Sequence, residues 1–255
     1  MRLRVSIWSV LRLSFTLIGK NFKAFLAFAF FFGLLSLAGI EEPASEEALA
    51  ALPSLQEWMR LGAVTLGFLV MSWLAIRYFV TGYRGKASLF PASPVFRYSR
   101  VLLRECVSNA LSALAGAVVA ASMLMLFAVF VESDLDVYAG FALVLGLLVY
   151  MAVYFRFTMY TLSLLVDDSF GLRPSWKLTR GLVFKAMLLL VPLLALIMGL
   201  DLALNSMDSA AVLLAFAGAS GLTASLSCGV LGGWYLAIER AYREPEVVTG
   251  ASGSF

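Results

Sequence analysis

Six long apolar stretches divide the chain, and each is close to the length that a helix needs to cross a bilayer. About 20 mostly apolar residues span the hydrocarbon core. Of the 255 residues, 62% are apolar and 14% charged, whereas a soluble domain has about 45–50% apolar and about 25% charged residues. The sequence therefore predicts an all-α, polytopic membrane bundle with transmembrane helices at Ala24–Ile40, Leu61–Val80, Val107–Val131, Val137–Phe157, Val183–Leu200 and Ala210–Ile238.

The charges between these stretches alternate in sign along the chain. Basic residues lie before the first span, in the second and fourth connections and after the sixth span; Arg60 is the one exception among 19 Lys and Arg. The other three connections are acidic. Because Lys and Arg favour the cytoplasmic side, we expect a multi-pass protein of the bacterial cytoplasmic (inner) membrane with both termini in the cytoplasm. Residues 1–243 are expected to form one domain, followed by a flexible tail at 244–255.

The first apolar stretch has two interpretations. Ser36-Leu37-Ala38 resembles the small-residue site at which a signal sequence is cleaved. The segment before it is longer than a signal n-region and is itself amphipathic. An uncleaved transmembrane span is therefore preferred.

Three cytoplasmic segments have the pattern of amphipathic helices at the membrane surface. In Val5–Lys20, Ser9, Arg12, Thr16 and Lys20 share one side, and Ile7, Leu11, Phe15 and Ile18 the other. Pro94–Arg104 places Arg97, Arg100 and Arg104 on one stripe, and Pro174–Lys185 groups Arg173, Lys177 and Arg180. Ser93 before Pro94 is typical of a helix start. The sequence therefore predicts three interfacial helices that contact anionic lipid headgroups.

These three segments also share an aromatic residue followed four positions later by Arg. The pairs are Trp8 and Arg12, Phe96 and Arg100, and Trp176 and Arg180. They favour a threefold repeat in which each unit is an interfacial helix followed by a transmembrane hairpin. The alternative is chance, since aromatic and Arg residues are both enriched at the cytoplasmic interface.

Small residues recur along one face of the third and sixth predicted spans. Because lipid is as apolar as Leu, membrane helices associate by close packing at such faces. The rows predict packing within this chain or, as the alternative, a face for helices of another membrane protein; their members are Ser108, Ser112, Gly116 and Ala120 in the third span, and Ala217, Gly221, Ser225, Gly229 and Gly233 in the sixth.

Residues that could carry chemistry are sparse. The chain has no His, and Cys106 and Cys228, at or within predicted spans, are expected to be small buried thiols. Asp167 and Asp168 lie shortly before Arg173, and we interpret them as forming an ion pair with this Arg. No predicted span carries a charge at its centre, where substrate-moving proteins usually have one. We therefore expect no catalytic site, no metal and no other cofactor.

Two further features have a structural interpretation. Glu132, Asp134 and Asp136 have a sparse calcium-like spacing but lack the Gly and distal Glu of such a loop, so a solvated turn is expected. Pro192 lies in the middle of the fifth predicted span and predicts a kink.

One stretch resembles a known family. The residues Asp168, Gly171, Ser175-Trp176, Leu178 and Arg180-Gly181, followed by an apolar span, are similar to the membrane domain attached to some glycerophosphoryl diester phosphodiesterases and to related stand-alone six-helix bacterial proteins of uncharacterised function. The likeness is best over residues 150–200. It implies a six-helix architecture and no hydrolase activity, because the chain has neither the phosphodiesterase domain nor its metal ligands.

Together these features favour a non-enzymatic membrane protein: a scaffold, an assembly factor or an accessory subunit of a membrane complex. Its expected partners are membrane lipids and the helices of other membrane proteins. Nucleic acid is not expected, since the apolar residues around the basic ones belong in lipid. The alternative is a small permease or lipid-handling transporter with alternating access around Pro192.

Overall fold

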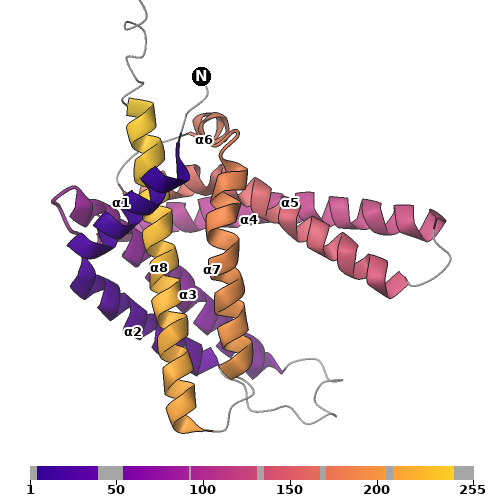
Figure 1. Cartoon of the computed structure of the whole chain (residues 1–255), viewed down its shortest axis with the longest axis horizontal. Coiled ribbons are helices and arrows are strands. Elements are labelled where there is room, and N and C mark those ends of the chain that lie inside the picture. The colour runs from indigo at the N-terminus through magenta and orange to yellow at the C-terminus, as the bar shows by residue number, and fades with distance from the viewer. Residues whose placement is uncertain are drawn as a thin grey trace, which may run out of the picture. The chain divides into compact units, whose positions relative to one another are not determined.

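The computed structural model describes residues 5–39, 54–91, 93–130, 135–166, 171–204 and 209–243. Within these ranges the chain is all-α, as predicted, with no strand. The helices are α1 (Ile7–Lys20), α2 (Phe22–Gly39), α3 (Leu55–Tyr83), α4 (Pro94–Phe130), α5 (Leu135–Leu165), α6 (Leu172–Leu178), α7 (Val183–Leu204) and α8 (Ala210–Arg243) (Figure 1).

Five helices in the described part of the chain are long and apolar enough to cross a membrane. They are Phe22–Gly39, Leu55–Tyr83, Pro94–Phe127, Tyr138–Leu165 and Ala211–Arg243. These helices cover five of the six predicted spans. The remaining one, Val183–Leu200, lies in the helix α7 but is not among the five. The structure is thus that expected of a multi-pass membrane protein, and the sixth crossing stays a prediction.

The start of α3 and the extent of α4 differ from the predicted boundaries. Ser54 and Glu57 form a capping box, in which each side chain accepts a hydrogen bond from the other residue's backbone N–H. This cap starts α3 at Leu55, before the predicted Leu61. Helix α4 begins at the predicted Pro94 but runs unbroken to Phe130. A separate interfacial helix ending at Arg104 was therefore the wrong prediction, because nothing between Arg104 and Val107 stops a helix.

The third predicted interfacial helix, Pro174–Lys185, is also wrong as a single element. Helix α6 ends at Leu178 and α7 begins at Val183. Between them Gly181 has φ +81°, a left-handed conformation that residues with a Cβ rarely adopt and that interrupts a right-handed helix. Pro174 does lie in the first turn of α6, as the sequence suggested.

The chain's contacts divide it into two compact units. One comprises residues 91–187, with α4, α5, α6 and the first turn of α7; the other comprises residues 5–90 and 188–243, with α1, α2, α3, the rest of α7 and α8. The units are described separately below.

In the second unit, α8 packs against α1, α2 and α3. Its small-residue row is in contact along its whole length with α2 and α1. A Cβ added to Gly33 of α2 would lie 2.8 Å from the carbonyl oxygen of Ala217, and one added to Gly221 would lie 2.7 Å from the backbone N of Gly33. Ser225 donates a hydrogen bond to the carbonyl oxygen of Phe25 at 3.1 Å.

The row continues past α2 onto α1. A Cβ on Gly229 would lie 2.7 Å from Ile18 Cδ1, and one on Gly233 would lie 2.8 Å from the backbone N of Ser14. Ser36 of α2 and Ser220 of α8 also share a buried hydrogen bond of 3.0 Å. The five small residues of α8 therefore serve packing within this unit.

In the first unit, α4 and α5 lie side by side over most of their length (Figure 1). They approach most closely at Gly116 and Gly146. A Cβ on Gly116 would lie 2.6 Å from the carbonyl oxygen of Gly146, and a Cβ on Gly146 would lie 2.9 Å from the Cβ of Ala120. Ser108 and Ser112 of the same row are buried. This row is likewise used between helices of one unit.

Candidate functional site

Helix α1 is held against the bundle and presents an exposed aromatic and basic surface. Val10, Ser14 and Leu17 are buried, and α1 contacts α8 and α3. Trp8 is 79% exposed and Phe15 64% exposed. Ser9, Arg12, Thr16 and Lys20 on the polar side are exposed as well. We call Trp8, Arg12, Phe15 and Lys20 the α1 surface.

The apolar side of α1 differs in part from the prediction. Ile18, assigned to lipid, packs on Gly229 instead. Ile7 and Leu11 are half-buried, and only Phe15 of the four is exposed. The helix therefore has three faces: one buried in the protein, one aromatic and one polar.

The second basic segment forms the first turns of α4. The Arg100 guanidinium lies 4.1 Å from the centre of the exposed Phe96 ring. Arg104 donates a hydrogen bond of 2.6 Å to the carbonyl oxygen of Tyr160 and lies 3.8 Å from the centre of that ring. Arg97 is half-buried. The three Arg residues of the predicted stripe therefore do not share one environment, because Arg104 binds α5 whereas Arg100 stays exposed.

The third segment attaches α6 to the C-terminal half of α5. Ser175 donates a hydrogen bond of 2.9 Å to the carbonyl oxygen of Arg156, and the Arg156 guanidinium lies 4.7 Å from the centre of the Trp176 ring. Phe157 contacts the same ring at 5.4 Å. Lys177 and Arg180 are exposed. Asp168, with Asp167, lies outside the described residues, so its predicted ion pair with Arg173 is not tested.

The three aromatic–Arg pairs thus make different contacts. Arg100 covers its own Phe96, whereas the cation over Trp176 is Arg156 and not Arg180. The first segment forms a separate helix, α1. The second is the start of the long apolar helix α4, and the third forms α6, a helix of only seven residues. A threefold repeat remains a hypothesis from sequence.

A buried polar cluster that the sequence analysis did not identify lies between α4 and α5. Glu105 is 6% exposed, and its carboxylate accepts hydrogen bonds from Tyr154 Oη and, at 3.2 Å, from Asn109 Nδ2. Tyr150 Oη donates to Asn109 Oδ1 at 2.5 Å. We call Glu105, Asn109, Tyr150 and Tyr154 the Glu105 cluster.

The only sequence signal for this cluster is its spacing. Glu105 and Asn109 lie one turn apart on one helix, as do Tyr150 and Tyr154 on the other. Glu105 also falls within the apolar helix Pro94–Phe127. The next residue, Cys106, is exposed, contrary to the prediction of a buried thiol, whereas Cys228 is buried as predicted.

A second buried acid lies on α8, in the other unit, and forms ion pairs with two Arg residues. Glu239, 8% exposed, accepts from Arg84 at 2.5 Å and from Arg243 at 2.9 Å. Arg84 ends α3, so this ion pair joins the ends of α3 and α8. A buried charge held in this way by two cations is a structural link.

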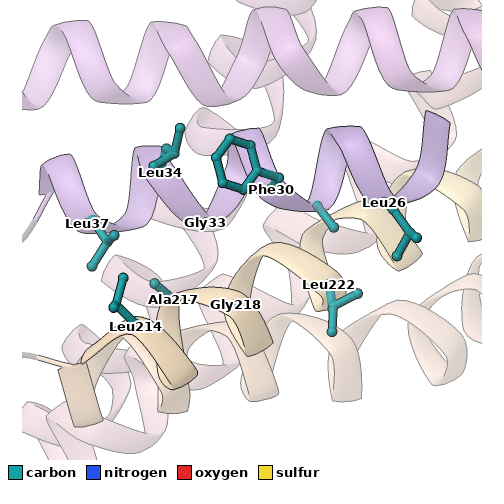
Figure 2. Close-up of a pocket in the computed structure, with 10 residues that line it drawn as sticks. Leu26, Phe30, Gly33, Leu34, Leu37, Leu214, Ala217, Gly218 and Leu222 are labelled. Carbon is teal, nitrogen blue, oxygen red and sulfur yellow. The ribbon is translucent and has the colours of Figure 1, made fainter. Parts of the chain in front are cut away.

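An apolar groove lies between α2 and α8 and has a volume of about 290 Å³. Figure 2 shows Leu26, Phe30, Leu34 and Leu37 of α2 along one side, and Leu214 and Leu222 of α8 along the other. Gly33 and Ala217 also line it. Among the described residues, no group of three or more His, Cys, Asp or Glu side chains is placed to hold a metal ion.

These features define the class of the protein: an all-helical, multi-pass membrane protein with a basic and aromatic surface, a buried carboxylate and an apolar groove. No family model, no curated protein and no solved structure matches the chain.

Proposed function

We propose that this chain is a non-enzymatic integral membrane protein that acts as a scaffold, an assembly factor or an accessory subunit of a membrane complex. In this role it binds lipid at the cytoplasmic interface and helices of other membrane proteins. The supporting observation is the α1 surface. An exposed Trp8 and Phe15 beside Arg12 and Lys20 match both lipid headgroups and an aromatic-rich protein interface.

The close packing of α1 on α8 also supports this proposal. Ser14 and Ile18 lie against Gly233 and Gly229 so closely that no side chain fits between them. A surface held rigidly loses little conformational freedom on binding. Both small-residue rows already pack against other helices of their own unit. Partner helices would therefore bind elsewhere, and the exposed α1 surface is the place we propose.

The proposed location is the bacterial cytoplasmic membrane, with both termini inside. It rests on the distribution of Lys and Arg. A distant relationship to the membrane domain of glycerophosphoryl diester phosphodiesterases is proposed on the Ser175-Trp176 segment. The contact of that segment with Arg156 gives it a structural role, the positioning of α6.

Native mass spectrometry of the gently solubilised protein tests the scaffold proposal. We expect a complex of fixed stoichiometry that is lost when Trp8 and Phe15 are both changed to Ser. The matched control changes Leu66 and Val70, which are exposed on α3, to Ser. A monodisperse monomer with no bound protein in mild detergent, or equal loss in both variants, would contradict the proposal.

A second candidate, a small permease, is favoured by the Glu105 cluster. A buried carboxylate in an apolar helix is costly and usually marks an ion or substrate path. Vesicles with a pH-sensitive dye inside test it: a proton-coupled permease would dissipate an imposed pH gradient, and Glu105→Gln would slow this to the rate of empty vesicles. Equal rates in wild-type and empty vesicles would count against it.

A further inference from the structure

The α2–α8 groove has one side open. Gly33 and Ala217 close its base by direct backbone contact, whereas a Cβ added to Gly218 would meet nothing within 4 Å. All the residues that line it are apolar or glycine. In a membrane such a groove is filled by hydrocarbon.

The dimensions of the groove match a single lipid chain. Leu26 and Leu37 mark its ends along α2, and at 1.5 Å per residue they lie about 16 Å apart. The hydrocarbon core of a bilayer is about 30 Å thick, so this is about the depth of one leaflet. A volume of about 290 Å³ is at the lower end of ligand pockets, which excludes bulky occupants.

One end of the groove carries a cation on the same face. Lys23 precedes Leu26, Phe30, Leu34 and Leu37 at helical three- and four-residue spacing, and its side chain is exposed. Lys20, just before the start of α2, lies 4.6 Å from the centre of the Tyr83 ring. The opposite end, at Leu37, has no Lys or Arg within a turn on α2.

We propose that the α2–α8 groove binds one acyl chain of an anionic phospholipid, with the lipid phosphate at Lys23. The proposal deepens the lipid-binding part of the proposed function and rests on it. The positive-inside distribution places Lys23 at the cytoplasmic leaflet. This site differs from the α1 surface. Here the groove would hold an acyl chain, and the single contact at Lys23 would select lipids with an anionic headgroup.

Photolabelling of the full-length protein tests this site. The protein is reconstituted into phosphatidylcholine vesicles that contain a small fraction of phosphatidylglycerol with a diazirine in its acyl chain. A parallel sample carries the same diazirine chain on phosphatidylcholine. We expect label on peptides with Phe30, Leu34 and Leu222, and about fivefold more from the anionic probe, the preference that one Lys near an anionic headgroup gives.

Two pairs of variants separate the groove from its headgroup contact. Gly218→Leu fills the groove, and Gly62→Leu is its control, since Gly62 also has nothing within 4 Å but lies outside the groove. We expect Gly218→Leu to remove most of the label and Gly62→Leu to leave it. Lys23→Gln should bring the two probes to equal labelling, whereas Lys86→Gln, at an exposed site off the groove, should not.

Equal groove labelling in Gly218→Leu and Gly62→Leu would overturn the proposal, as would equal labelling by the two probes in the wild type. A wild-type protein that forms no complex but is still labelled in the groove would refute the scaffold role alone, so the two proposals fail separately.

Discussion

Gly218 and Gly221 lie within one turn of α8, yet only one of them has room for a side chain. A Cβ on Gly221 would lie 2.7 Å from the backbone N of Gly33 and closer still to the carbonyl oxygen of Ala29. Backbone cannot move aside as a flexible side chain can, so Gly221→Ala should destabilise the protein by about 1–3 kcal/mol. Gly218→Ala, the control, should be neutral or stabilise it by up to about 1 kcal/mol. Unfolding in detergent measures both, and equal stability of the two variants would contradict the packing.

Glu105 is the acceptor on which the cluster between α4 and α5 depends. Glu105→Ala leaves Tyr154 Oη without its acceptor, which costs about 1–3 kcal/mol, whereas Asn109 Nδ2 keeps its hydrogen bond to the backbone carbonyl oxygen of residue 105. Glu105→Gln retains an acceptor and should cost less. Ser122→Ala on the exposed face of α4 should change the free energy of unfolding by less than about 0.5 kcal/mol. If Glu105→Ala were as stable as Ser122→Ala, the cluster would not be formed as described.

At the residue scale, the sequence predicts small-residue faces well and buried polar contacts poorly. Gly229 and Gly233 repeat every fourth position on one helix, so a single segment shows the row. The partners of Glu105 and Arg104 lie on α5, far along the chain. No local spacing relates residues on two helices, and the register between α4 and α5 is set by the Gly116–Gly146 contact.

At the scale of the element, α6 is too short to be stable alone and depends on α5. Helices shorter than about 12–15 residues are marginal in water without tertiary contacts. Trp176→Ala removes the Arg156 contact, a cation–π interaction of about 0.5–2 kcal/mol, together with the contact to Phe157. We expect faster limited proteolysis within residues 171–182. Lys177→Ala, an exposed change on the same helix, should leave the cleavage rate unchanged; equal rates in the two variants would contradict the docking.

Elements also show where hydrophobic pattern alone misleads. The amphipathic stripe at Arg97, Arg100 and Arg104 correctly indicates a helix but not its end, because a stripe contains no stop signal. Helix α6 ends at Leu178 with Thr179 as its cap, and Gly181 with positive φ separates it from α7. Periodicity therefore identifies helices here, whereas their boundaries depend on caps and turns; the Ser54–Glu57 capping box can be recognised in the sequence, but the positive φ of Gly181 cannot.

For the whole molecule, the main question is whether α7 crosses the membrane. If it does, Lys177 before α7 and Ser209 after it lie on opposite sides; if it does not, they lie on the same side. Single Cys residues at these exposed positions can be labelled with a membrane-impermeant maleimide. The Cys106→Ser background is needed, since Cys106 is exposed, whereas Cys228 is buried.

The positive-inside distribution predicts that Ser209→Cys reacts in intact cells and that Lys177→Cys reacts only after the membrane is opened. Gln56→Cys, at the acidic end of α3, is the outside control, and Lys86→Cys, after the same helix, is the inside control. If Ser209→Cys and Lys177→Cys were both protected while the controls behaved as expected, α7 would not cross and α8 would begin inside. In that case the C-terminal end of α8, with Arg240 and Arg243, would lie outside. The charge distribution opposes this arrangement, because two cations would then have to be carried across the bilayer.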